Sequence, residues 1–66
     1  MGYYEIYDKR KHTQFNVCVR DWQGLTVYLM GRCGMTEAQA NTTADWMQTA
    51  ERFDNLTVGR FTVSKV

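Results

Sequence analysis

The sequence predicts a small α+β domain with the element order ββααβ, in which a three-stranded antiparallel sheet packs against two helices on one face. Residues 3–8, 13–20 and 58–66 alternate between the two faces of a strand, which is typical of half-buried strands. Apolar residues recur at helical spacing over 22–33 and 36–53. We therefore expect a two-layer sandwich that forms a single domain over residues 1–66.

The first two strands form the predicted N-terminal hairpin. Tyr4 and Ile6 share one face of the first strand, and Phe15, Val17 and Val19 share one face of the second. The polar residues 9–12 lie between them and contain no Asn-Gly pair, so we expect a connection longer than a two-residue turn.

Residues 22–33 carry start and stop signals for the first helix. Asp21 is a suitable N-cap, and Gly34 can adopt the left-handed conformation that closes a helix. Residues 25–29 are also rich in β-branched and aromatic side chains, which favour a strand. We prefer the helix, and the strand remains the alternative interpretation, which would add one strand to the sheet.

The second helix has the clearest signature. Thr36 and Gln39 have the spacing of a capping box, in which each side chain accepts a hydrogen bond from the other residue's backbone N–H. We expect the helix to run to about residue 53, with Asn55 just past its end. Its predicted apolar side comprises Ala40, Ala44, Trp46, Met47, Ala50 and Phe53.

The C-terminal segment is expected to form one strand that pairs with the first hairpin. Phe61 and Val63 share its apolar face. The junction at residues 33–39 then turns the second helix back across the sheet. The predicted shared core consists of Phe15, Trp22, Leu29, Ala44, Met47 and Phe61.

Composition excludes several classes of function. The formal net charge is +1, and no apolar run is long enough for a transmembrane helix. The N-terminus lacks the apolar core of a signal peptide, so we expect a cytoplasmic protein without membrane contact. Cys18 and Cys33 match no metal spacing and are expected to be free thiols, and His12 lies in a charged loop. We therefore predict a non-enzymatic protein without cofactor or metal.

Two surfaces are candidates for binding a protein partner. The outer face of the sheet should combine tyrosines with arginines, which are favoured anchors at interfaces. Its expected members are Tyr3, Tyr7, Asn16, Arg20, Arg60 and Thr62. The polar face of the second helix is the other candidate, with Asn41, Asp45, Gln48 and Arg52.

Charge is unevenly distributed along the chain and leaves a second function class open. Acidic residues gather on or beside the second helix, whereas the hairpin is basic. A small nucleic-acid-binding domain would use the sheet face together with Lys9, Arg10, Lys11 and Arg20, because cations supply most non-specific affinity for phosphates.

In layout, the whole chain resembles small proteins encoded by phages and mobile elements, including anti-CRISPR proteins and phage inhibitors of host enzymes. The resemblance lies in the short chain, the aromatic first strand over residues 3–7, one main helix over 36–53, and the closing strand at 60–63. It implies a stoichiometric inhibitor that covers a surface of a host bacterial protein or nucleoprotein complex, as a monomer or homodimer. No functional residue carries over from these families, since they share no site.

Overall fold

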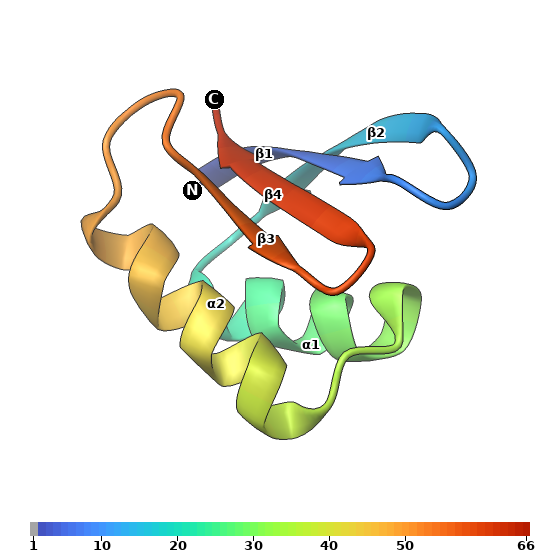
Figure 1. The fold of residues 1–66 in the computed structure, drawn as a ribbon. Coiled ribbons are helices and arrows are strands. Elements are labelled where there is room, and N and C mark those ends of the chain that lie inside the picture. The colour runs from blue at the N-terminus through green and yellow to red at the C-terminus, as the bar shows by residue number, and fades with distance from the viewer. Residues whose placement is uncertain (1) are drawn as a thin grey trace.

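Four antiparallel strands and two helices build the domain in the computed structural model, which describes residues 2–66. The elements follow the order β1 (Gly2–Asp8), β2 (Thr13–Val19), α1 (Trp22–Cys33), α2 (Glu37–Thr49), β3 (Asn55–Val58) and β4 (Phe61–Lys65). Within the sheet the strand order is β2-β1-β4-β3. Both helices lie against one face of this sheet, and its other face carries no helix (Figure 1).

The expected three-stranded sheet with ββααβ order is wrong, because the C-terminal segment forms a hairpin rather than one strand. Val58 ends β3 and Phe61 begins β4, and these two residues face each other across the pair. The connection consists of Gly59 and Arg60 alone, with Gly59 at a φ of 59°. Glycine at the first position of a two-residue turn matches the II′ geometry that suits the twist of paired strands. As expected, the last strand pairs with the first hairpin, through β1 and β4.

Helix α2 ends earlier than predicted, at Thr49, and Asn55 begins β3 instead of following the helix. A side chain from the far end of the chain fixes this end. The Lys65 ammonium donates hydrogen bonds to the carbonyl oxygens of Met47 (3.3 Å) and Ala50 (2.9 Å). These carbonyls have no partner within the helix, and a cation near a helix C-terminus is favourable for the helix dipole.

The remaining helix boundaries agree with the sequence signals, and residues 22–33 are a helix rather than a strand. The Asp21 carboxylate accepts the backbone N–H of Gly24 at 2.8 Å and caps α1. Gly34 closes α1 at a φ of 66°. Thr36 and Gln39 form both hydrogen bonds of the capping box, each at 3.1 Å. The junction between the helices is therefore specified by its own residues.

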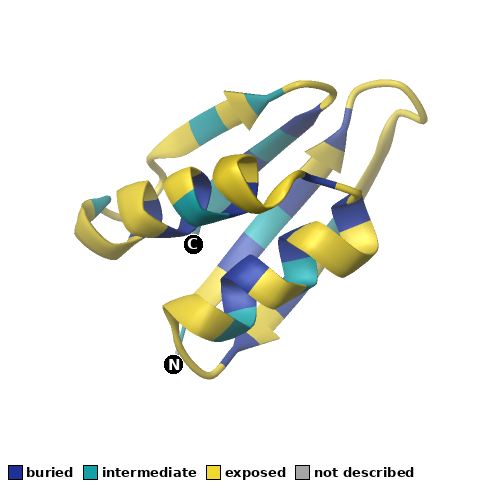
Figure 2. Cartoon of the chain, turned by 90° about the horizontal axis from the view of Figure 1, so that it is seen from below, coloured by how far each residue is buried: buried dark blue, intermediate teal, exposed yellow. Residues whose placement is uncertain are grey.

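The core lies between the sheet and the inner sides of the helices (Figure 2). Leu29, Ala44, Met47 and Phe61 are buried as expected. Two members of the predicted core are not. Trp22, the first residue of α1, is 43% exposed, and Phe15 is only half-buried. The fully buried apolar side chains are Ile6, Leu25, Leu29, Ala40, Ala44, Met47 and Val63.

Neither helix in residues 2–66 is both long and apolar enough to span a lipid bilayer.

Candidate functional site

The face of the sheet that points away from the helices is the first candidate surface, here called the open face. Strand β1 turns Tyr4, Ile6 and Asp8 inward, and Tyr3 and Tyr7 are exposed on the other side. This alternation follows from the period of two along a strand. The described residues of the open face are Tyr3, Glu5, Tyr7, Gln14, Asn16, Cys18, Asn55, Thr57, Thr62 and Ser64.

Cross-strand pairs hold the polar side chains of the open face in place. The Gln14 amide donates to the Glu5 carboxylate at 2.7 Å. The hydroxyl groups of Thr57 and Thr62, which are directly opposite on β3 and β4, lie 3.0 Å apart. Such pairs contribute a few tenths to about 1 kcal/mol each. The open face is therefore a built surface on paired strands, not a loop.

One end of the open face is hollowed, with a volume of about 660 Å³. Segments distant in sequence close its side. The Val66 N–H donates to the Tyr3 carbonyl at 3.1 Å, and the Phe53 N–H donates to the Lys65 carbonyl at 2.6 Å. The segment after α2 thereby rises beside the C-terminus (Figure 1). The residues that line this hollow include Tyr3, Glu5, Asn16, Cys18, Arg52 and Val66.

The segment between α2 and β3 displays an aromatic ring in solvent next to this hollow. Phe53 is 68% exposed and has a φ of 74°, a conformation that is unfavourable for a side chain of this size. The turn is held by the Glu51 N–H, which donates to the Asp54 carboxylate at 2.9 Å. The Arg52 guanidinium lies 4.9 Å from the centre of the Phe53 ring, within the range of a cation–π contact.

The structure separates the residues that were predicted to share the outer sheet face. Tyr3 and Tyr7 lie on the open face as predicted, whereas Arg20 follows the end of β2 and is exposed there. Arg60 is not on the open face. It lies in the β3–β4 turn, and its side chain pairs with Asp8, which points to the helix side of the sheet. The buried Asp8 carboxylate attracts the Arg60 guanidinium to the helix side of the sheet, so Arg60 does not lie on the predicted outer face.

The predicted polar face of the second helix is also smaller than expected. Asp45 and Gln48 are exposed on α2, and Asn41 is half-buried. Arg52 lies beyond the end of the helix and lines the hollow of the open face. Phe53 was expected on the apolar side of the helix, but its ring is exposed next to Arg52. Lys65 contacts the carbonyl oxygens at this helix end, and the local Glu51–Asp54 hydrogen bond holds the turn that follows it.

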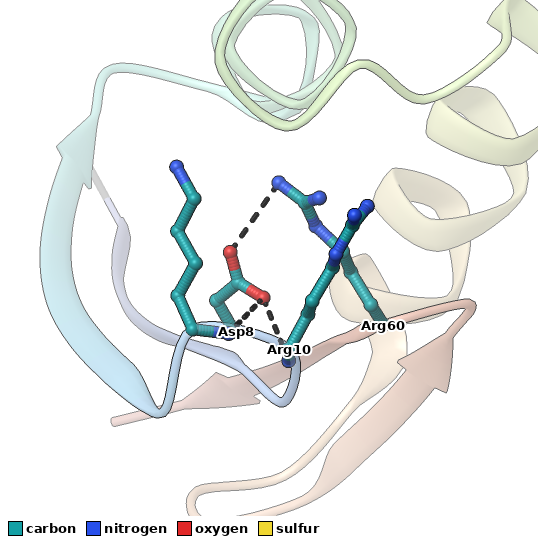
Figure 3. A network of polar contacts seen from close by, with 4 residues as sticks. Asp8, Arg10 and Arg60 are labelled. Atoms are coloured by element: carbon teal, nitrogen blue, oxygen red, sulfur yellow. Dashed lines mark hydrogen bonds and ion pairs between the residues drawn. The ribbon is translucent and has the colours of Figure 1, made fainter.

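The basic hairpin is organised by Asp8, a residue that the sequence analysis did not single out. Asp8 is 3% exposed, and its Oδ1 accepts the backbone N–H groups of Arg10 (3.0 Å) and Lys11 (3.2 Å). Its Oδ2 lies 3.4 Å from Arg60 (Figure 3). The signal was present in the strand period, which places Asp8 on the same face as the buried Ile6.

Two buried side chains among the described residues have shifted pKa values. Burial, and secondarily the negative charge of Asp8, raises the pKa of the Cys33 thiol against the opposing effects of Arg60 and Arg32. A thiol with a raised pKa stays protonated and is a poor nucleophile. Burial likewise raises the pKa of the Tyr4 phenol. Within residues 2–66, no group of three or more His, Cys, Asp or Glu side chains is placed to hold a metal ion.

No protein-family model matches the chain, and no curated protein or solved structure matches it either. The functional proposal therefore rests on the contacts, charges and exposed groups described above.

Proposed function

We propose that this protein is a non-enzymatic interaction protein of the phage or mobile-element type. In this proposal it acts in the bacterial cytoplasm as a stoichiometric inhibitor, as anti-CRISPR proteins do, and covers a working surface of a host complex. The observation that carries the proposal is the hollowed open face, where Tyr3 and Arg52 line a space of about 660 Å³ and the exposed Phe53 ring lies against the Arg52 guanidinium.

The chemistry of this surface supports protein binding. Tyr, Phe and Arg are enriched at protein interfaces, where large rings and a forked cation provide much of the binding energy. Phe53 is 68% exposed and Tyr3 is 57% exposed, so both rings can lose water on binding. Burial of apolar area contributes about 25 cal/mol per Å², so two such rings are worth several kcal/mol before binding costs.

Rigidity of the scaffold favours the same surface. Tyr3 and Glu5 stand on β1, which pairs with β2 on one side and β4 on the other. Side chains on a paired central strand are already positioned, which reduces the conformational entropy lost on binding. A protruding partner segment with both polar and apolar groups would fit this hollow, because Glu5 and Arg52 present opposite charges at its wall.

An immunity assay in bacteria tests the proposal. Cells that carry an active CRISPR system are challenged with a targeted phage while they express the protein, across a panel of system types. We expect the wild type to restore phage growth against one system. The Arg52→Ala/Phe53→Ala variant should lose this effect, because both side chains are exposed and their removal leaves the core intact.

The matched control is Asp45→Ala/Gln48→Ala, which truncates two exposed residues of α2. It should inhibit as strongly as the wild type. Loss of inhibition in the control with retention in the Arg52/Phe53 variant would assign binding to the helix face instead. If every CRISPR system in the panel still blocks the phage in cells that express the wild-type protein, the anti-CRISPR proposal is wrong.

A further inference from the structure

Basic residues gather at the end of the molecule opposite to the hollow of the open face. Of the eight Lys and Arg residues, five belong to this basic end: Lys9, Arg10, Lys11, Arg32 and Arg60. They come from the β1–β2 turn, the last turn of α1 and the β3–β4 turn. One acidic residue, Asp8, lies among them, and the other six acidic residues are distributed over the rest of the chain.

The fold itself assembles this charge from three distant segments. The Lys9 N–H donates to the Arg60 carbonyl at 2.8 Å, which joins the two turns. Asp8 holds the first turn through two backbone N–H groups and reaches Arg60 at 3.4 Å. In Figure 3 the side chains of Arg10 and Arg60 both extend from these turns toward the helices. Asp8 therefore orders the cluster, and it offsets one of the five positive charges.

Two adjoining hollows open among these residues, with volumes of about 550 and 520 Å³. Arg32 and Arg60 line both, and Lys11 lines the first. Gly31 also lines both, and no atom of another element lies within 4 Å of where its Cβ would be. The C-terminus of α1 adds a partial negative charge of about half a unit, which is small beside five cations.

The character of the basic end points to phosphate groups rather than to a protein surface. Protein interfaces have an apolar core. In residues 2–66, none of the large hydrophobic side chains that are exposed lines either hollow. Arginine forks match phosphate oxygens, and lysines contribute point charges. We propose that the basic end binds the sugar–phosphate backbone of a nucleic-acid strand, through Lys9, Arg10, Lys11, Arg32 and Arg60 and without base specificity.

This site goes beyond the proposed inhibitor function and differs from the nucleic-acid surface that the sequence suggested. Arg20 is not part of it, and neither is the open face. Arg32 and Arg60 replace them. The two surfaces lie at different places on the fold, so one protein can hold a strand and a protein partner at once, as a nucleoprotein target would require.

Fluorescence anisotropy with a labelled single-stranded DNA of about 20 nucleotides tests the site, with NaCl varied from about 20 to 300 mM. We expect binding that weakens with salt, with a log–log slope of about −3.5 if all five cations contact phosphates of a single strand. The Lys11→Glu/Arg32→Glu variant should bind at least about tenfold more weakly, with a slope smaller by about 1.4. Both side chains are exposed, so the fold should persist.

The matched control is Arg20→Glu/Arg52→Glu, which makes the same change in net charge outside the basic end. At about 150 mM NaCl it should bind DNA within about twofold of the wild type, because the Debye length is then about 8 Å and charges outside the basic end are screened from the bound strand. An equal loss in both double variants would mean a general charge effect and overturn the site. Absence of binding at the lowest salt would overturn the site too. Tighter binding to polyglutamate than to DNA would also overturn it.

Discussion

Replacing Gly59 by Ala should destabilise this protein, whereas replacing Gly31 by Ala should stabilise it. A Cβ built at either position meets no atom of another part of the chain within 4 Å, so neither change introduces a tertiary clash. The two positions differ in backbone conformation. Gly59 has a φ of 59° in the β3–β4 turn, and Gly31 lies within α1. The comparison therefore isolates the backbone requirement of the turn that creates the fourth strand.

The expected magnitudes follow from these conformations. A left-handed backbone costs a residue with a Cβ about 1–2 kcal/mol, and the lower entropy of the unfolded chain offsets about 0.4–1 kcal/mol of this. Gly59→Ala should thus lower the free energy of unfolding by about 1 kcal/mol. Gly31→Ala should raise it by about 0.5–1 kcal/mol, since alanine favours a helix over glycine. For a domain of this size, the two melting temperatures should differ by roughly 10 °C.

Thermal and urea unfolding, followed by circular dichroism and tryptophan fluorescence, measures this difference. Trp22 and Trp46 lie on the two helices and report on the helical layer. Equal urea m-values in the three proteins would show that only stability has changed. A Gly59→Ala variant as stable as the wild type would refute the reasoning. The β3–β4 turn would then not require a residue with a positive φ at position 59.

The remaining predictions concern buried ionisable groups. Asp8→Asn should lower the free energy of unfolding by about 1 kcal/mol, because the amide keeps one acceptor for the turn but loses the charge that faces Arg60. A urea midpoint equal to that of the wild type would contradict the role of Asp8. Iodoacetamide should modify the exposed Cys18 much faster than the buried Cys33 in the native protein, and mass spectrometry would count the labels. Equal rates before unfolding would contradict the burial of Cys33. Because burial raises the pKa values of Cys33 and Tyr4, the folded state keeps these protons longer than the unfolded state. This contribution to stability should be complete below about pH 8.5 and decline as the pH rises through the folded-state pKa values. A urea midpoint that stays constant or rises above about pH 9 would contradict it.

Local signals predicted the helical layer well. Asp21, Gly34, Thr36 and Gln39 act within three or four residues of themselves, so the sequence shows the start and the stop of α1 and the start of α2 where the structure has them. The end of α2 was not predictable in this way. It depends on Lys65, which lies 15 residues beyond Ala50 in sequence and reaches it only when the sheet is formed.

The fourth strand was missed although its signal was present. Residues 55–58 and 61–65 flank Gly59-Arg60, and two such segments around a two-residue turn with glycine first are typical of a hairpin. A helix that runs to residue 53, with Asn55 just past its end, leaves no room for a strand that begins at Asn55. The misplacement of Arg60 has the same origin, because a residue in a tight turn no longer follows the alternation of a strand.

The candidate surfaces were partly predictable. Strand alternation alone places Tyr3 and Tyr7 on the open face, and the basic turn is evident in the sequence. What the sequence could not show is the assembly of distant segments. Arg52 reaches the hollow of the open face, and Arg32 reaches the basic end, through tertiary packing of loops and helix ends.

The open face as the partner-binding surface is the central claim, and an NMR chemical-shift map tests it most directly. The isotope-labelled protein is titrated with the host complex that the immunity assay identifies as its target. We predict that backbone amide signals change in β1, in β2 and in residues 50–54 around Arg52 and Phe53, and that the outward positions Asp45 and Gln48 of α2 stay unaffected. Changes confined to α1 and α2, with the open face unperturbed, would contradict the account.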